Sequence, residues 1–276
     1  MNWFRSAPSG RLGLIAGQGE FPVLFAEAVF SLKKDLVVFG LRNYTDPRVE
    51  QYAPEMHYVD LWALGDLVGL LKKSNIKNVV LAGGVPKREI YNSSFKMDDT
   101  AEGFIHSTGN KGDDHLLKAF EIFLKLKCGI SVVDSRIFLK DALAPKGVLT
   151  QRPPTPEEWK DLRFGYKIAK GIGKMDIGQT VVVKSGAVLA VEALEGTDHA
   201  MRRGGELGHG DVVVVKAAKP NQDLRFDLPC AGIQTLSVLK SISSKVLGVE
   251  AGKTILLRKK EFLEAADKQG VTLVGM

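Results

Sequence analysis

The chain contains little cysteine and no long apolar run. Two of its 276 residues are cysteine, Cys128 and Cys230, and the sequence has no CxxC pair. A disulfide framework or a zinc site is therefore not expected, and a reducing cytoplasm is the default compartment. No apolar segment approaches the roughly 20 residues that span a bilayer. The apolar run after Arg11 is interrupted by Gln18 and Glu20, so it does not form a signal-peptide core.

Neither sign of charge dominates the composition. The 38 Lys and Arg residues outnumber the 32 Asp and Glu residues, for a net charge of +6. The sequence shows no dense basic stripe and no ladder of aromatic residues, which argues against a nucleic-acid partner. A modest excess of this kind suits an anionic small molecule or an anionic membrane surface.

The first half alternates strand-like and helix-like segments. Such an alternation predicts an α/β fold, here a Rossmann-like parallel sheet with helices on both faces. The expected strands are 12–16, 36–41, 56–59, 78–82 and 130–133, and the expected helices are 22–34, 64–73 and 113–127.

Ligands of such sheets bind at the carboxyl ends of the strands. Gly17-Gln18-Gly19 and Gly83-Gly84 follow two of these strands. The first is an incomplete dinucleotide fingerprint, because Pro22 stands where a third glycine is expected and no acidic residue follows the second strand. We therefore expect a backbone-amide cradle for part of a nucleotide or sugar, and no NAD site.

A proline cluster separates the two halves. Pro145, Pro153, Pro154 and Pro156 lie within twelve positions. We predict an N-terminal domain over 1–145, a linker over 146–160, and a mixed α/β domain over 161–276 that carries most of the site motifs. Its expected elements are a hairpin of strands 180–184 and 187–193, strands 212–216, 254–257 and 271–274, and helices 234–244 and 261–268.

The loop from Lys216 to Thr235 concentrates charge beside a strand. It contains Lys216, Lys219, Asp223, Arg225 and Asp227. Lys and Arg can hold phosphate oxygens, and two carboxylates can bind a divalent metal or accept a proton from water. If the segment is extended, period-two spacing places the two carboxylates and the arginine on one face. The alternative is a solvated loop whose ion pairs merely shape it.

Two further motifs flank the expected hairpin. Asp176-Ile177-Gly178-Gln179 precedes its first strand, and Glu195-Gly196-Thr197-Asp198 follows its second. Polar groups at both ends of one hairpin can face a common cleft. Turn formation by Asp176 and helix capping by Thr197-Asp198 are the alternatives.

Taken together, these three motifs resemble the bacterial UDP-2,3-diacylglucosamine pyrophosphatases that make lipid X in lipid A synthesis, the type unrelated to calcineurin-like phosphoesterases. In the first half, 12–17 and 112–117 match the same family, so the resemblance covers nearly the whole chain. It implies a cytoplasmic hydrolase of a Gram-negative bacterium, acting peripherally at the inner face of the inner membrane on a lipid-linked UDP-sugar. It also implies a Mg²⁺-dependent attack of water on the β-phosphorus, with Mn²⁺ or Co²⁺ as alternative ions, to give UMP and 2,3-diacylglucosamine 1-phosphate.

Within that reaction we expect Asp227 to carry the chemical step as metal ligand or general base. Asp223 supports it as a second metal ligand, and Arg225 keeps both carboxylates ionised. The residues expected to bind substrate are Gly17, Gln18, Gly83, Asp114, Gln179, Glu195, Gly196, Thr197, Asp198, Arg203, Lys216, Lys219, Gln222 and Thr235.

Two other functions are compatible with parts of the pattern. A non-hydrolytic nucleotide-sugar binding or sensor protein would use the same cations, but it would not need a carboxylate pair beside them. An NAD-dependent oxidoreductase is disfavoured by the incomplete glycine fingerprint. The oligomeric state stays open between a monomer and a homodimer.

Overall fold

The computed structural model describes residues 8–85, 96–108, 113–220, 222–226 and 228–276, with only the backbone of Asp113 and Asp114. The chain forms two compact units. Unit 1 comprises Met1–Lys140 and Asp223–Asp227, and unit 2 comprises Asp141–Gln222 and Leu228–Met276. A short loop of the second half of the sequence therefore belongs to the first unit. The domain boundaries at 145 and 160 stay a prediction.

Unit 1 contains a five-stranded sheet in the order β3-β2-β1-β4-β5, and every neighbouring pair is parallel. Its strands are β1 (Leu12–Ala16), β2 (Leu36–Leu41), β3 (Glu55–Val59), β4 (Asn78–Ala82) and β5 (Ser131–Val132). The strand order reverses between β1 and β4, which is the switch point where doubly wound sheets bind ligands. β1 and β2 are buried along their whole length, which explains why they are continuously apolar in sequence.

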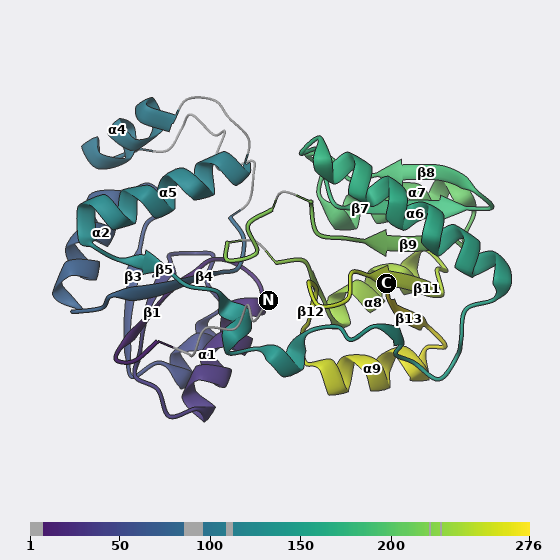
Figure 1. Cartoon of the computed structure of the whole chain (residues 1–276), viewed down its shortest axis with the longest axis horizontal. Coiled ribbons are helices and arrows are strands. Elements are labelled where there is room, and N and C mark those ends of the chain that lie inside the picture. Colours follow the sequence, from purple (N-terminus) through teal and green to yellow (C-terminus); the bar gives the residue numbers. More distant parts are fainter. Residues whose placement is uncertain (1–7, 86–95, 109–112, 221, 227) are drawn as a thin grey trace. The chain divides into compact units, whose positions relative to one another are not determined.

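Helices cover both faces of this sheet (Figure 1). α1 (Phe21–Ser31) packs on one face, and α2 (Leu64–Lys73) and α5 (Asp113–Cys128) lie on the other, with α4 (Asp99–Thr108) beside α5. Short 3₁₀ turns occupy Pro47–Tyr52, Ser135–Ile137 and Lys140–Ala142. The core between the sheet and α2 and α5 contains Phe39, Leu71 and Leu124, and also Phe226 from the inserted loop.

Unit 2 contains a six-stranded mixed sheet in the order β6-β13-β11-β9-β7-β8. Its elements are β6 (Gly147–Val148), β7 (Thr180–Lys184), β8 (Ala187–Val191), β9 (Val213–Lys216), β11 (Val246–Val249), β13 (Thr272–Gly275), and the helices α6 (Pro156–Lys174), α7 (Thr197–Gly208), α8 (Ile233–Ser241) and α9 (Lys259–Lys268). β10 (Cys230–Ala231) and β12 (Ile255–Leu256) form a separate parallel pair.

The valines of unit 2 show how its sheet separates two cores. Val181 and Val215 pack in the core that includes Leu162 of α6, whereas Val182 and Val214 pack in the core that includes Met201 of α7. Successive side chains of a strand point to opposite faces, so an unbroken run of valines supplies both layers. The result is a three-layer arrangement with α6 on one face and α7 and α8 on the other (Figure 1).

α7 approaches its neighbours closely because it contains glycine at the points of contact. A Cβ on Gly204 would lie 2.5 Å from Val182 Cβ, and one on Gly205 would lie 2.3 Å from Ile242 Cβ. These two positions bring the helix onto β7 and α8. They thereby set where the first turn of α7 lies.

The predicted α/β class and the Rossmann-like first domain are confirmed, and the expected helix 64–73 is α2. α4 and β11 were not predicted, and neither were the two-residue strands β6 and β10. α4 is a polar segment with a glycine inside, held by Phe104 packing on Phe120 and Phe123. β11 is a central strand of four residues just after α8.

The helix expected over 234–244 ends earlier, at Ser241, and Ser243 has a left-handed φ of 51° that no helix interior tolerates. Within the described residues, no helix combines the length and apolarity that crossing a bilayer requires.

Candidate functional site

A small cavity in unit 2 lies at the carboxyl end of β9. Its volume is about 130 Å³. Four residues expected to bind substrate line it together, although they are distributed over 39 positions of sequence. The lining residues are Thr180, Thr197, Asp198, Met201, Val214, Lys216, Cys230, Ala231, Thr235 and Leu247.

Two helices begin at this cavity. Thr197 and Asp198 form the first turn of α7, and Thr235 lies in the first turn of α8. α7 begins after Gly196, whose φ of 83° is strained for any side chain, and no side chain caps its first amides. Unpaired amides and the positive end of a helix dipole favour an anion. The ammonium of Lys216, which donates to the carbonyl of Cys230 at 3.1 Å, adds a full positive charge.

A network of hydroxyls and one carboxylate holds the wall of this cavity. Thr197 Oγ1 donates to Glu192 Oε1 at 2.9 Å, and the hydroxyls of Thr180 and Thr197 lie 3.5 Å apart. Glu192 Oε2 accepts from the Gln179 amide at 3.3 Å. Glu192 is buried and Thr180 is fully buried. The hairpin ends are thus joined to each other, as the sequence motifs suggested.

Gln179 has an unused hydrogen-bonding atom. Its backbone carbonyl accepts from Ala217 at 2.9 Å, which ties the start of β7 to the loop after β9. Its side-chain oxygen is buried and accepts no hydrogen bond from the described residues. Such a group costs about 1–3 kcal/mol, and a donor on a ligand would remove that cost.

Lys219 is held differently from Lys216. It is buried, and its ammonium donates to Asp176 Oδ1 at 2.5 Å. The Gln222 side chain accepts from the Lys219 amide at 3.1 Å, which closes the turn. Asp176 has a left-handed backbone, with φ of 58°. Lys219, Gln222 and Asp176 therefore shape the loop that carries the next charged residues.

Glu195 and Arg203 pair with each other outside the cavity lining. Arg203 donates to Glu195 Oε1 at 2.7 Å and to the carbonyl of Val191 at 3.0 Å. The hydrogen bond from Arg203 holds the pKa of Glu195 below its usual value. Both side chains fasten the β8–α7 connection that contains Gly196.

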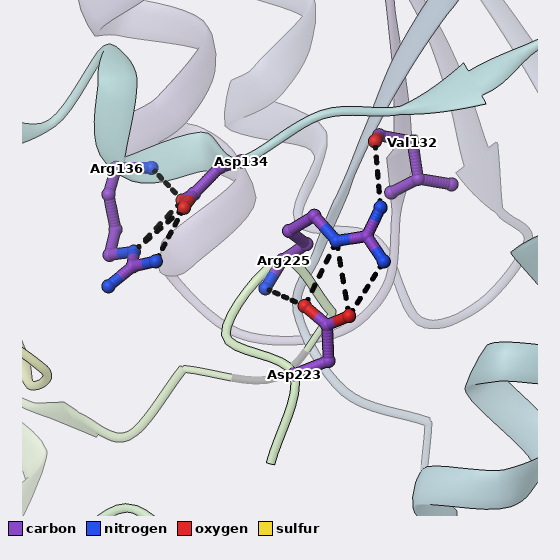
Figure 2. Close-up of polar contacts among 5 residues, drawn as sticks. All are labelled: Val132, Asp134, Arg136, Asp223 and Arg225. Atoms are coloured by element: carbon purple, nitrogen blue, oxygen red, sulfur yellow. Dashed lines mark hydrogen bonds and ion pairs between the residues drawn. The ribbon is translucent and has the colours of Figure 1, made fainter. Parts of the chain in front are cut away.

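The inserted loop forms a tight, charged turn in unit 1 (Figure 2). Arg225 donates from Nε and Nη2 to both carboxylate oxygens of Asp223, at 2.6–3.1 Å. Its other edge pairs with Glu121 of α5, with one hydrogen bond of 2.9 Å, and contacts the carbonyl of Val132 at 3.5 Å. The guanidinium lies 4.9 Å from the Phe226 ring centroid.

Paired hydrogen bonds dominate the electrostatics of this turn. Burial raises the pKa of Asp223, but hydrogen bonds from the side chain and amide of Arg225 outweigh it, so the pKa lies below its usual value. The hydrogen bonds that Arg225 donates to Asp223 likewise raise the pKa of Arg225. Both groups are charged at neutral pH.

The inserted loop is not extended, so the condition under which Asp223 and Arg225 would share one strand face is not met. Residues 224–226 form a turn, in which the Phe226 amide donates to the carbonyl of Asp223 at 3.0 Å. The Asp223 side chain also accepts from the Arg225 amide at 3.1 Å. A carboxylate that satisfies the backbone two residues on favours a turn over a strand.

The same Asp-x-Arg turn occurs elsewhere in unit 1. Asp134 accepts from the amide, Nε and Nη2 of Arg136 at 2.6–3.0 Å, as Figure 2 shows. Asp46 and Arg48 make the same bonds at 2.7–3.1 Å. The Asp223–Arg225 fork is therefore a local backbone motif. What distinguishes it is the hydrogen-bonded additional partner Glu121, since the further carboxylate beside Arg48, Glu20, lies 4.0 Å away.

The glycine turns of unit 1 fit closely against each other. A Cβ on Gly17 would lie 2.4 Å from the Gly84 carbonyl oxygen, and one on Gly83 would lie 2.6 Å from that of Gln18. The Gly17 and Gln18 amides donate to the carbonyls of Ala82 and Gly84, both at 2.8 Å. Two amides of the expected cradle are thus already used, and ligand binding by Gly17, Gln18 and Gly83 stays a prediction.

Two predicted residues lie outside what the structure describes. These are Asp227 and the side chain of Asp114, although α5 does begin at Asp113 as expected. Among the described residues, no three His, Cys, Asp or Glu side chains come together as metal ligands. Both oxygens of Asp223 are engaged by Arg225. As it stands, Asp223 does not fit as a metal ligand.

The sequence analysis did not predict three residues that hold these sites in place. Thr180 carried no signal because it only begins a valine-rich strand. Glu192 lies three residues before the motif Glu195–Asp198, and only the residues of that motif were predicted to bind substrate. Glu121 looks like any polar residue of an amphipathic helix.

The fold and the cavity define a two-unit α/β protein with a small pocket at the carboxyl end of β9, lined by Lys216 and the first turns of α7 and α8. The chain belongs to the LpxI family: residues 11–142 match the model of the LpxI N-terminal domain, and residues 145–274 match that of the LpxI C-terminal domain. It is 31% identical over 283 residues to a protein of Caulobacter vibrioides named UDP-2,3-diacylglucosamine pyrophosphatase LpxI, covering 96% of this chain and 97% of that protein.

Other similarities are partial. The bifunctional purine biosynthesis protein PurH of Deinococcus radiodurans is 30% identical over 139 residues, which is 49% of this chain and 24% of that protein. Among solved structures, the biotin carboxylase domain of the Hydrogenobacter thermophilus 2-oxoglutarate carboxylase aligns with a TM-score of 0.28 at 11% identity. That alignment covers 71% of this chain and 41% of the domain, and a score so low carries no argument about function.

Proposed function

We propose that the chain hydrolyses the pyrophosphate bond of UDP-2,3-diacylglucosamine in lipid A synthesis. Membership of the LpxI family and similarity along the whole length to a pyrophosphatase of that name support this activity. The observation that carries it is the unit 2 cavity. There, Lys216 and the first turns of α7 and α8 meet in a space of about 130 Å³.

This cavity suits one phosphoryl group of the substrate. Pockets for whole drug-sized ligands measure roughly 300–1,000 Å³, so the acyl chains and the nucleoside lie elsewhere. Lys216 would offset one negative charge, and the amides of α7 would donate to phosphoryl oxygens. Thr235 adds a hydroxyl donor, whereas the hydroxyl of Thr197 already donates to Glu192. Gln179, with its unused buried oxygen, would accept from a hydroxyl or amide of the substrate.

In the proposed reaction, water attacks the β-phosphorus. The bond between that phosphorus and the bridging oxygen breaks, UMP leaves with the bridging oxygen, and the other product is 2,3-diacylglucosamine 1-phosphate. Asp227 accepts the proton of the attacking water. Asp223 and Arg225 act as positioning residues, because their fork with Glu121 fixes the turn that precedes Asp227.

A requirement for a divalent cation, Mg²⁺ with Mn²⁺ or Co²⁺ as alternatives, remains part of the proposal. Mg²⁺ usually keeps several waters and uses one or two carboxylates. Asp223 is engaged by Arg225, so no step is assigned to an ion held there. We expect UMP release to stop in excess EDTA and to return when Mg²⁺ is added back. Undiminished turnover in the chelator would remove the cation from the proposal.

The site of attack can be read from an isotope. Purified protein is incubated with UDP-2,3-diacylglucosamine in H₂¹⁸O, and the products are separated by mass spectrometry. We expect UMP without ¹⁸O and sugar 1-phosphate with one ¹⁸O. Label in UMP would place the attack on the α-phosphorus, and no cleavage at all would favour a binding or sensor protein.

Asp227→Asn tests the chemical step. We expect turnover to fall by about 10²–10⁴-fold, the range of a lost general base, while KM and the melting temperature stay near those of the unchanged protein. Asp211→Asn, which alters a carboxylate outside both sites, is the control. Near-normal turnover of Asp227→Asn would transfer the role to Asp223.

A further inference from the structure

α5 has two sides with opposite uses. Its inner side carries Leu124, which is fully buried, and Glu121, which pairs with Arg225 of the inserted loop. Its outer side carries Ile122 and Leu126, which are 59% and 79% exposed. They are one helical turn apart and therefore lie next to each other on the surface.

Lysines surround this aliphatic pair. Lys118 and Lys125 lie one turn before and beside Ile122 on the same exposed face, and Lys127 follows Leu126. Lys125 also lines an open hollow of about 590 Å³ with Lys72 and Lys77, at the C-terminal ends of α2 and α5. Glu121 is the one acidic side chain of α5 that the structure describes, and its carboxylate is engaged on the inner side. We call Ile122, Leu126 and these five lysines the α5 surface.

This composition is that of a peripheral membrane contact. Aliphatic side chains enter the boundary between headgroups and acyl chains, and lysines beside them meet anionic headgroups. A second copy of the chain on the same surface would bring like-charged lysines together across the two-fold axis, which disfavours a dimer there. Charge complementarity thus selects an anionic lipid surface as the partner.

We propose that the α5 surface docks unit 1 on an anionic bilayer, with Ile122 and Leu126 inserted and the lysines over the headgroups. This proposal rests on the proposed function only for the reason why the protein would dock, because a diacylated substrate resides in a membrane. α5 would then connect membrane binding with the position of the inserted loop, because the helix that contacts lipid also holds Arg225 through Glu121.

Docking is measured without any nucleotide-sugar lipid, so it does not depend on the reaction. The full chain is sedimented with vesicles of phosphatidylcholine, with or without phosphatidylglycerol. We expect binding only to the anionic vesicles, weakening as salt is raised. The double variant Ile122→Glu, Leu126→Glu and the double variant Lys125→Gln, Lys127→Gln should each bind at least roughly tenfold more weakly. Leu32→Glu, at a 55% exposed leucine that ends α1, is the matched control and should bind normally.

Activity gives the second readout. With a short-chain, detergent-dispersed substrate, both double variants should turn over at the rate of the unchanged protein, and with substrate in anionic vesicles they should be slower. Equal binding of the unchanged protein to neutral and anionic vesicles would overturn the proposal. The proposal would also be overturned if the double variants bound anionic vesicles as well as the unchanged protein does. It would be overturned as well if their only difference from the unchanged protein were a smaller oligomer in gel filtration. Absence of hydrolysis with intact vesicle binding would count against the proposed function alone.

Discussion

At the residue scale, Lys216 and Lys219 show how burial gives two lysines of the same loop different roles. Lys216 is half-buried at the end of β9 and lines the cavity, while Lys219 is buried and bonded to Asp176. A lysine already neutralised by a carboxylate has less to offer a phosphate. The cavity therefore gains its charge from Lys216.

Replacing each lysine with methionine should distinguish the two roles. We expect Lys216→Met to raise KM by about 10–100-fold, equivalent to the 1.5–3 kcal/mol of a charged hydrogen bond, with little change in melting temperature. Lys219→Met should lower the free energy of unfolding by about 1 kcal/mol or less, because it breaks the ion pair with Asp176, whose exposed carboxylate can be hydrated instead. Steady-state kinetics and thermal denaturation give the two readouts. A raised KM in Lys219→Met, together with a loss of stability in Lys216→Met, would contradict the assignment of Lys216 to the cavity.

Arg225 is the second residue whose role depends on geometry. Its guanidinium satisfies two carboxylates at once through its planar fork, which a lysine cannot do. The turn before Asp227 is held by these bonds. Its twin at Asp46 and Arg48 has the same local bonds in a part of unit 1 with no proposed role.

We expect Arg225→Lys to lower turnover by about 10–100-fold, because roughly 1.5–3 kcal/mol of charge-assisted bonding to the turn is lost. Arg48→Lys, the matched change in the twin turn, should keep normal turnover. The comparison is made by kcat at saturating substrate, with circular dichroism to check the fold. Equal activity of the two variants would show that order in this turn does not matter for catalysis.

At the scale of elements, α7 depends on its glycines. Its first turn supplies Thr197 and Asp198 to the cavity, and its later turns must lie close to β7 and α8 for that to happen. Glycine weakens a helix by roughly 1 kcal/mol relative to alanine. Here the close packing of the helix offsets that cost.

Gly204→Ala should therefore destabilise the protein, although alanine is the better helix former. We expect a loss of about 1–3 kcal/mol in the free energy of unfolding, the usual cost of overpacking, measured by denaturant titration. Gly171→Ala is the control in α6, where an added Cβ would meet nothing within 4 Å. That variant should be neutral or more stable by up to about 1 kcal/mol. Equal effects at both positions would show that propensity, and not packing, sets the result.

At the scale of the whole molecule, the chain passes from unit 2 into unit 1 and back within one loop. Phe226 is buried in the unit 1 core with Phe39 and Leu124, while the residues on either side of the loop belong to unit 2. A residue from the second half of the sequence thus contributes to the stability of the first unit.

Phe226→Ala should loosen unit 1 selectively. Removing a buried phenylalanine costs about 3–5 kcal/mol, and hydrogen exchange read by mass spectrometry should then show faster exchange in β1 and β2 than in β7 and β9. Leu236→Ala, in the unit 2 core, is the matched control and should show the opposite pattern. Faster exchange of unit 2 in the Phe226 variant would mean that the loop belongs to unit 2 in solution.

Several features of the site could be predicted because they are local. The hairpin expected from strands 180–184 and 187–193 placed the motifs that contain Gln179 and Thr197 near each other. The Asp-x-Arg spacing occurs four times, in turns at Asp46, Asp134 and Asp223 but inside α6 at Asp161, so the spacing by itself does not decide between a turn and a helix. The partners of these residues could not be predicted, because Glu121 and Arg225 are 104 positions apart.

The sequence by itself determined the α/β class, the two-domain plan and the LpxI family, since periodic burial and ordered motifs are recorded residue by residue. Tertiary structure alone decided which charges meet. Packing buried Lys219 against Asp176, left Lys216 at the cavity, and carried the Asp223–Arg225 turn into unit 1 against Glu121. Electrostatic strength depends on distance and burial in three dimensions, and neither quantity can be read from spacing along the chain.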